Sequence, residues 1–114
     1  MVDQIRPAQL PDWLRDHAAG GKPLVLDVRE PWEVQAASVK ADDAYELLVI
    51  PMSQMPAALS QLNPQRATAV LCHHGSRSQR VAMYLEQQGF TQVANIAGGI
   101  DAWSNELDPA VPRY

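Results

Sequence analysis

The sequence predicts an α/β fold in which a mostly parallel sheet of four to five strands is covered by helices on both faces. Short apolar runs alternate along the chain with segments of helical periodicity. The apolar runs contain few polar positions, which is typical of parallel strands that are buried on both faces. Segments rich in glycine or charge follow several of these runs, at the sheet edge where such folds bind ligands.

The first half of the chain predicts two helices and two strands. The first helix carries a prolyl residue in its first turn, ends at a pair of glycines and buries one face, formed by Leu10, Trp13, Leu14 and Ala18. An apolar run over 23–28 predicts a buried strand, and Pro31 then opens a short helix at a favoured early position. Residues 47–50 form a second apolar strand. Between these elements, residues 35–46 are polar without clear periodicity and predict a surface loop.

The second half continues the alternation. Ser53 is positioned to cap a helix whose apolar face is formed by Met55, Ala58, Leu59 and Leu62. Residues 67–71 predict a third strand, and residues 78–88 predict a helix that Gly89 ends. A fourth strand over 92–96 leads through two glycines into a short final helix.

Length and composition limit the functional classes. A chain of 114 residues is expected to form a single domain over residues 1–114. Its net charge of −4 argues against nucleic acid or an anionic membrane surface as the main partner. Without a long apolar run or a signal-peptide pattern, we expect a soluble, cytoplasmic protein. One cysteine allows no internal disulfide and no cysteine-rich metal site.

The only cysteine, Cys72, lies at the turn between the strand at 67–71 and the helix that follows. A thiol in this place faces the positive end of a helix, where unpaired backbone N–H groups favour an anion. Arg77, five positions further on, adds a positive charge. Both features favour the thiolate, which is the nucleophilic form. A buried packing cysteine is the alternative, but it has no need of a polar, basic-ended loop, and we therefore predict that Cys72 is a nucleophile.

The cysteine is followed by a loop that consists of His73, His74, Gly75, Ser76 and Arg77. Gly75 permits a tight turn whose N–H groups cradle an anion. We expect one of the histidines to line the pocket, with a general-base role as the alternative. Because adjacent loop histidines usually point apart and no third ligand is near them in sequence, we predict no metal site.

Three charged residues are expected to support this loop. Arg77 either holds the anionic group of a substrate or braces the loop through a carboxylate. Asp27 and Arg29 lie at the end of the strand predicted at 23–28, at the same edge of the predicted sheet. We expect them to form a structural ion pair near the loop rather than to take part in the reaction.

Three motifs together resemble the rhodanese-like domain family. Residues 26–33 are similar to its first signature, residues 72–77 to its six-residue active-site loop, and residues 97–103 to its closing Gly-Gly-x-x-x-Trp segment. They have the family's order and spacing and extend over nearly the whole chain. Residues 35–46 lack the Gly-His-Ile-Pro-Gly-Ala-like stretch of many members. The resemblance implies a three-layer rhodanese-like fold and a thiosulfate sulfurtransferase, without a cofactor, in which Cys72 carries a persulfide.

The resemblance also implies the partners, and it leaves alternatives open. They are a small-molecule sulfur donor and a thiol or cyanide acceptor, with a sulfur-relay protein as a further option. Related cysteine-loop phosphatases and arsenate reductases place five residues between cysteine and arginine, whereas four separate Cys72 from Arg77 here, which favours sulfur. A non-catalytic binding or regulatory module would more typically have lost the cysteine, so the retained Cys72 argues against it. A persulfide carrier that serves a partner protein stays open.

Overall fold

Five parallel strands form one sheet in the computed structural model, which describes residues 2–40 and 42–114. The strands are β1 (Asp3–Ile5), β2 (Leu24–Asp27), β3 (Glu46–Val49), β4 (Thr68–Leu71) and β5 (Val93–Ile96), and their spatial order is β1-β5-β4-β2-β3. In the register of the two central strands, Asp27 is paired with Leu71. The segments that follow β2 and β4 therefore leave the sheet side by side, and the predicted fold class is confirmed.

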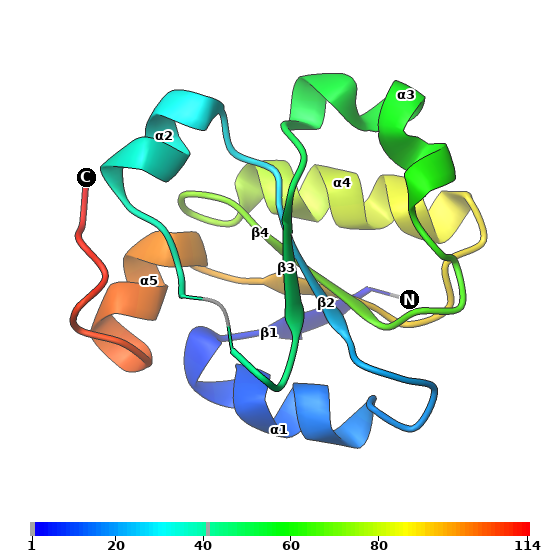
Figure 1. Cartoon of the computed structure of the whole chain (residues 1–114), viewed down its shortest axis with the longest axis horizontal. Coiled ribbons are helices and arrows are strands. Elements are labelled where there is room, and N and C mark those ends of the chain that lie inside the picture. Colours follow the sequence, from blue (N-terminus) through cyan, green and yellow to red (C-terminus); the bar gives the residue numbers. More distant parts are fainter. Residues whose placement is uncertain (1, 41) are drawn as a thin grey trace.

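Helices cover both faces of this sheet (Figure 1). They are α1 (Leu10–Asp16), α2 (Pro31–Ala36), α3 (Met55–Ala58), α4 (Ser76–Gln87) and α5 (Gly99–Glu106), with short 3-10 turns at Pro7–Gln9, Met52–Gln54 and Leu59–Gln61. One apolar core packs α1 and α5 against the sheet, and a second packs α3 and α4 against the opposite face. Side chains of β2 alternate between them, because Val25 belongs to the first core whereas Leu24 and Leu26 belong to the second.

The structure corrects several details at the edges of the sheet. The edge strand β1 was not predicted, because only Ile5 of its three residues is buried and three residues carry no readable alternation. The predicted apolar strand at 47–50 is β3, which is also an edge strand and is only partly buried. Among the described residues, no helix has the length and apolar character needed to cross a membrane.

Other corrections concern helix ends and the predicted surface loop. Ser53 is not a cap, since it lies inside a 3-10 turn and α3 begins at Met55. Ala18 is exposed beyond the end of α1, and α4 begins at Ser76, two residues earlier than predicted. The segment 35–46 is not simply a surface loop, because it buries Ala37, Val39 and Tyr45, although its residue 41 lies outside the described residues.

Candidate active site

The segments that follow β2, β4 and β5 meet at the carboxyl edge of the sheet. The loop after β4 runs beside the start of α5 (Figure 1) and is bonded to it, because the Ile100 N–H donates to the Cys72 carbonyl at 2.9 Å. The Asp101 N–H donates in the same way to the His73 carbonyl at 3.2 Å. On the other side, the Val28 N–H donates to the Leu71 carbonyl at 2.9 Å. Cys72 therefore leaves β4 between the segments that follow β2 and β5.

Two glycines allow this close approach. Gly75 is the N-cap of α4 and has a φ of +110°, a left-handed conformation that side chains rarely adopt. Gly99 has a φ of +60°, and a Cβ there would lie 2.4 Å from the carbonyl oxygens of both Cys72 and His73. The glycine at the first position of α5 is therefore what lets the loop backbone rest on that helix.

The thiol of Cys72 is buried and lies within reach of hydrogen-bond donors. Only 1% of the residue is exposed. Its Sγ accepts the N–H of Gly75 at 3.0 Å, and the hydroxyl oxygen of Ser78 lies 3.3 Å away. The Gly75 N–H thus points into the loop toward the sulfur, which is the orientation that the predicted anion cradle requires.

A chain of neutral polar groups continues from Ser78, and we call Ser78, Asn95 and Gln4 the sulfur-contact network. The buried Ser78 hydroxyl also bonds the Gly75 carbonyl and the Asn95 Oδ1, and the Asn95 amide donates to Gln4 Oε1 at 2.9 Å. A hydroxyl has one proton, so Ser78 can turn it toward Sγ when the sulfur is anionic. Sequence analysis missed this network because a serine and an asparagine inside regular elements give no distinctive signal.

Arg77 forms an ion pair with Glu33, a residue that sequence analysis also missed. Its two terminal nitrogens donate to the two carboxylate oxygens of Glu33 at 2.6 and 2.7 Å. The Arg77 hydrogen bonds hold the pKa of the Glu33 carboxyl at about 2 although burial opposes this shift. Of the two roles expected for Arg77, the structure thus contains the bracing contact through a carboxylate.

A second ion pair supports the first. Arg29 and Asp27 are buried, and their closest nitrogen–oxygen distance is 2.7 Å, as expected for a structural pair. Arg29 also donates to the Glu33 carbonyl at 3.2 Å and to the Tyr114 hydroxyl at 3.1 Å, and this hydroxyl donates to Glu33 Oε1 at 2.9 Å. We call these five residues, Asp27, Arg29, Glu33, Arg77 and Tyr114, the bracing network. Glu33 had one signal in the sequence. It lies three residues after Glu30 in a helix that begins at Pro31, which is the position of a capping glutamate.

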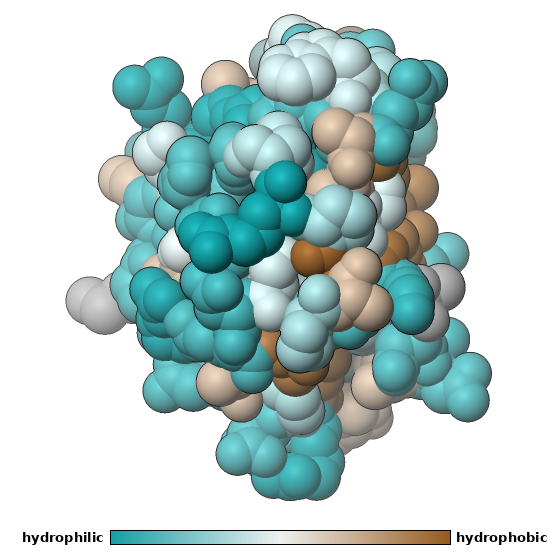
Figure 2. All heavy atoms as spheres, turned by 90° about the vertical axis from the view of Figure 1, so that its left-hand side faces the viewer, coloured by the Kyte–Doolittle hydropathy of each residue, from teal (hydrophilic) through white to brown (hydrophobic). Residues whose placement is uncertain are grey.

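The remaining loop residues lie at the surface side of the turn. Ser76 is the first residue of α4 and is exposed. The prediction that the histidines point apart was wrong, because the His73 and His74 rings stack with centroids 3.9 Å apart. His73 also stacks on Tyr114, at 4.0 Å, and burial lowers its pKa. The side of the molecule that carries α2, α5 and this loop is mostly hydrophilic (Figure 2).

The chain is similar to known proteins over almost its whole length. The family model of the rhodanese-like domain matches residues 10–106. The chain is 38% identical to a chloroplastic rhodanese-like/PpiC domain-containing protein of Arabidopsis thaliana, over 99% of this chain and 38% of that protein. A sulfurtransferase of Allochromatium vinosum is 32% identical over 97% of this chain and 96% of its own length. The crystal structure of a rhodanese-related protein from Thermoplasma volcanium superposes with a TM-score of 0.73 at 29% identity, covering 98% and 99% of the two chains.

Proposed function

Because the chain belongs to the rhodanese-like domain family, we propose that it is a sulfurtransferase in which Cys72 carries the transferred sulfur as a persulfide. One observation carries the proposal. The only thiol of the chain lies in the loop between β4 and α4, where the Gly75 N–H donates to its Sγ at 3.0 Å. A fixed N–H donor stabilises a sulfur anion, both as the thiolate and as the persulfide that replaces it. The Allochromatium relative, which is matched over almost its whole length, is named as a sulfurtransferase.

The proposed reaction has two steps, with thiosulfate as donor. The Cys72 thiolate attacks the outer sulfur of thiosulfate, an S–S bond forms, and sulfite leaves with the electron pair of the broken S–S bond. An acceptor such as cyanide or a thiolate then attacks the terminal sulfur of the persulfide. That S–S bond breaks, the acceptor keeps the sulfur, and the Cys72 thiolate returns. No external oxidant or reductant is needed.

The side chains around the loop have distinct parts in this proposal. The Ser78 hydroxyl donates a hydrogen bond to Sγ while the sulfur is anionic, and turns to donate to Asn95 Oδ1 when the sulfur is protonated. Arg77 is a positioning residue, because its bonds to Glu33 fix the start of α4.

The bracing contact disfavours the phosphatase and arsenate reductase alternative. Those reactions need an arginine that is free to bind a tetrahedral oxyanion. Here Arg77 gives two hydrogen bonds to Glu33, and four residues separate it from the cysteine. A persulfide carrier is the second candidate, favoured by the Arabidopsis relative, in which the matched region is 38% of a protein whose name includes another domain.

The experiment that tests the proposal measures thiocyanate formed from thiosulfate and cyanide by the purified chain. Wild-type protein is expected to form thiocyanate, and Cys72→Ala and Cys72→Ser are expected to form none while retaining the wild-type circular dichroism spectrum. A phosphate ester should yield no free phosphate. Thiocyanate formation by either Cys72 variant, or efficient phosphate release by the wild type, would overturn the proposal.

A further inference from the structure

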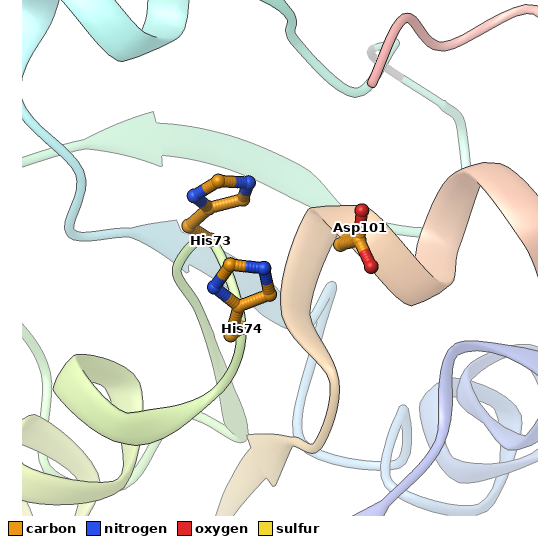
Figure 3. Close-up of side chains that lie close together, drawn as sticks. All are labelled: His73, His74 and Asp101. Carbon is orange, nitrogen blue, oxygen red and sulfur yellow. The ribbon is translucent and has the colours of Figure 1, made fainter. Parts of the chain in front are cut away.

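Three side chains with metal-binding atoms converge beside the loop. His73 and His74 come from the loop and Asp101 from the first turn of α5 (Figure 3), and one ligand atom from each lies within 4.8 Å of the others. Sequence analysis found no third ligand because Asp101 is distant along the chain. The fold brings it close by bonding the Asp101 N–H to the His73 carbonyl.

One atom of this cluster has no other partner. The Nε2 of His73 is buried and makes no hydrogen bond among the described residues. The same ring is held in place by stacking, with its centroid 3.9 Å from that of His74 and 4.0 Å from that of Tyr114. A buried polar atom without a partner is rare in folded proteins and indicates an unmet interaction. A histidine ring that is held by stacking and has an unpaired nitrogen can present the lone pair of that nitrogen to a metal ion.

The three ligands together suit a borderline divalent cation. Two imidazoles and one carboxylate supply three ligands and leave a fourth position open, as in many zinc sites. Imidazole favours zinc, copper and nickel, whereas magnesium and calcium take oxygen ligands. Asp101 accepts hydrogen bonds from Arg113 at 3.0 and 3.2 Å, and its oxygens keep lone pairs for a cation.

The cluster requires a small closure to bind such an ion. Ligand atoms around a tetrahedral zinc lie about 3.3 Å apart, given bonds of about 2.0–2.1 Å. The three atoms here are at most 4.8 Å apart, so the movement needed is no more than about 1.5 Å. His74 is exposed, and its ring can leave the stack with His73 by turning about its side-chain bonds.

We propose that His73, His74 and Asp101 form a binding site for a borderline divalent cation, for which Zn²⁺ is the probe. The ion links the loop to α5. Two of its ligands directly follow Cys72 in the chain, so a bound ion restrains the loop and slows loading of sulfur onto Cys72. This last consequence rests on the proposed function, whereas the site itself does not.

Isothermal titration calorimetry, which measures the affinity of the full chain for Zn²⁺, tests the site. His74→Ala and Asp101→Asn are expected to weaken binding at least tenfold, and Mg²⁺ should not bind. Two matched variants should retain the wild-type affinity. They are His17→Ala, which removes the one histidine outside the cluster, and Cys72→Ser, which removes the thiol. Arg113→Ala should bind Zn²⁺ at least as tightly as the wild type, because it removes a cation that competes for the Asp101 carboxylate. Unchanged affinity in His74→Ala and Asp101→Asn, or its loss in Cys72→Ser, would overturn the site.

A second measurement tests the effect on sulfur loading. Intact mass after brief exposure to thiosulfate reports the persulfide without cyanide, which itself binds zinc. Zn²⁺ should slow loading of the wild type several-fold, should affect Asp101→Asn much less, and should lose its effect after addition of a chelator. Zinc binding that leaves loading unchanged would overturn the restraint of the loop. If zinc-free protein never loads sulfur, the proposed function fails, whereas the titration still decides the site.

Discussion

The two polar networks beside Cys72 differ in charge and in what they touch. The sulfur-contact network is neutral and reaches Sγ through the Ser78 hydroxyl, which bonds Asn95. The bracing network consists mainly of two ion pairs, Asp27–Arg29 and Glu33–Arg77, and its hydrogen bonds join β2, α2, α4 and Tyr114 to one another. Neutral groups meet the sulfur, and charged groups fix the loop.

This difference has a physical reason. A hydroxyl can turn its single proton between two acceptors at little cost, which suits a sulfur whose charge changes during a reaction. A buried ion pair is rigid, and removing one partner leaves an uncompensated charge. We therefore expect damage to the bracing network to reduce both stability and activity. Damage to the sulfur-contact network should reduce activity more selectively.

The largest effect is expected from Gly99→Ala, because both networks depend on the path of the loop over α5. The new Cβ would lie 2.4 Å from two loop carbonyl oxygens, and φ is +60°. We expect at least a hundredfold loss of sulfur transfer and a loss of more than about 2 kcal/mol in the free energy of unfolding. Gly20→Ala is the matched control, since a Cβ there meets no atom within 4 Å. Equal behaviour of the two variants in urea unfolding and turnover would contradict the role assigned to Gly99.

Arg77→Ala should give the next largest effect. It leaves the Glu33 carboxylate, whose side chain is only 4% exposed, without its main partner. We expect a loss of about 3 kcal/mol in the free energy of unfolding, together with slower sulfur transfer. The double variant Arg77→Met/Glu33→Gln should recover much of the stability, because no charge is left unpaired. If urea unfolding shows that the double variant loses as much stability as Arg77→Met and Glu33→Gln lose in sum, the two residues are not coupled.

The loss of stability at acid pH reports on the Glu33 carboxyl. Its pKa in the folded protein is about 2, against 4.5 for an ordinary glutamate, so its stabilising contribution is present above pH 4.5 and is lost as the pH falls toward 2. This difference corresponds to about 2 kcal/mol lost between pH 6 and pH 3. Chemical denaturation at several pH values should therefore show a shallower acid decline for Glu33→Gln than for the wild type. Parallel declines would mean that Glu33 keeps an ordinary pKa in the folded protein.

Ser78→Ala should have the smallest effect and the most selective one. It removes the hydroxyl beside Sγ, and we expect roughly tenfold slower sulfur transfer with about 1 kcal/mol lost in stability. Ser104→Ala is the control, because that buried serine bonds the carbonyls of Ile100 and Val111 and has no part in either network. It should lose similar stability while turnover stays unchanged. If both serine variants turn over at the same rate, the sulfur-contact network has no role in transfer.

The sequence predicted the fold and the centre of the site because both depend on local patterns. Apolar runs followed by helical periodicity specify a parallel α/β sheet, and parallel strands bring their carboxyl ends to one edge. Cys72 and Arg77 come after β4, and Asp27 and Arg29 lie at the end of β2, so all four residues are at this edge. The edge strand β1 escaped prediction because three residues with one buried side chain carry too little signal.

The partners of these residues could not be predicted, because they come from distant parts of the chain. Glu33 reaches Arg77 from α2, Asn95 reaches Ser78 from β5, and Asp101 reaches the histidines from α5. The ring of Tyr114 stacks on His73, and its hydroxyl donates a hydrogen bond to Glu33. Contacts of this kind depend on the exact packing of helices on the sheet, which side-chain periodicity does not specify.

Intact-mass measurement after incubation with thiosulfate tests the central claim most directly, because the chain has one cysteine. The account predicts a gain equal to one sulfur atom, located by peptide mapping on the fragment that contains Cys72. Cyanide should remove the added sulfur, and Cys72→Ala should show no gain. An unchanged mass in the wild type, or an added sulfur on any other fragment, would contradict the claim that Cys72 carries the transferred sulfur.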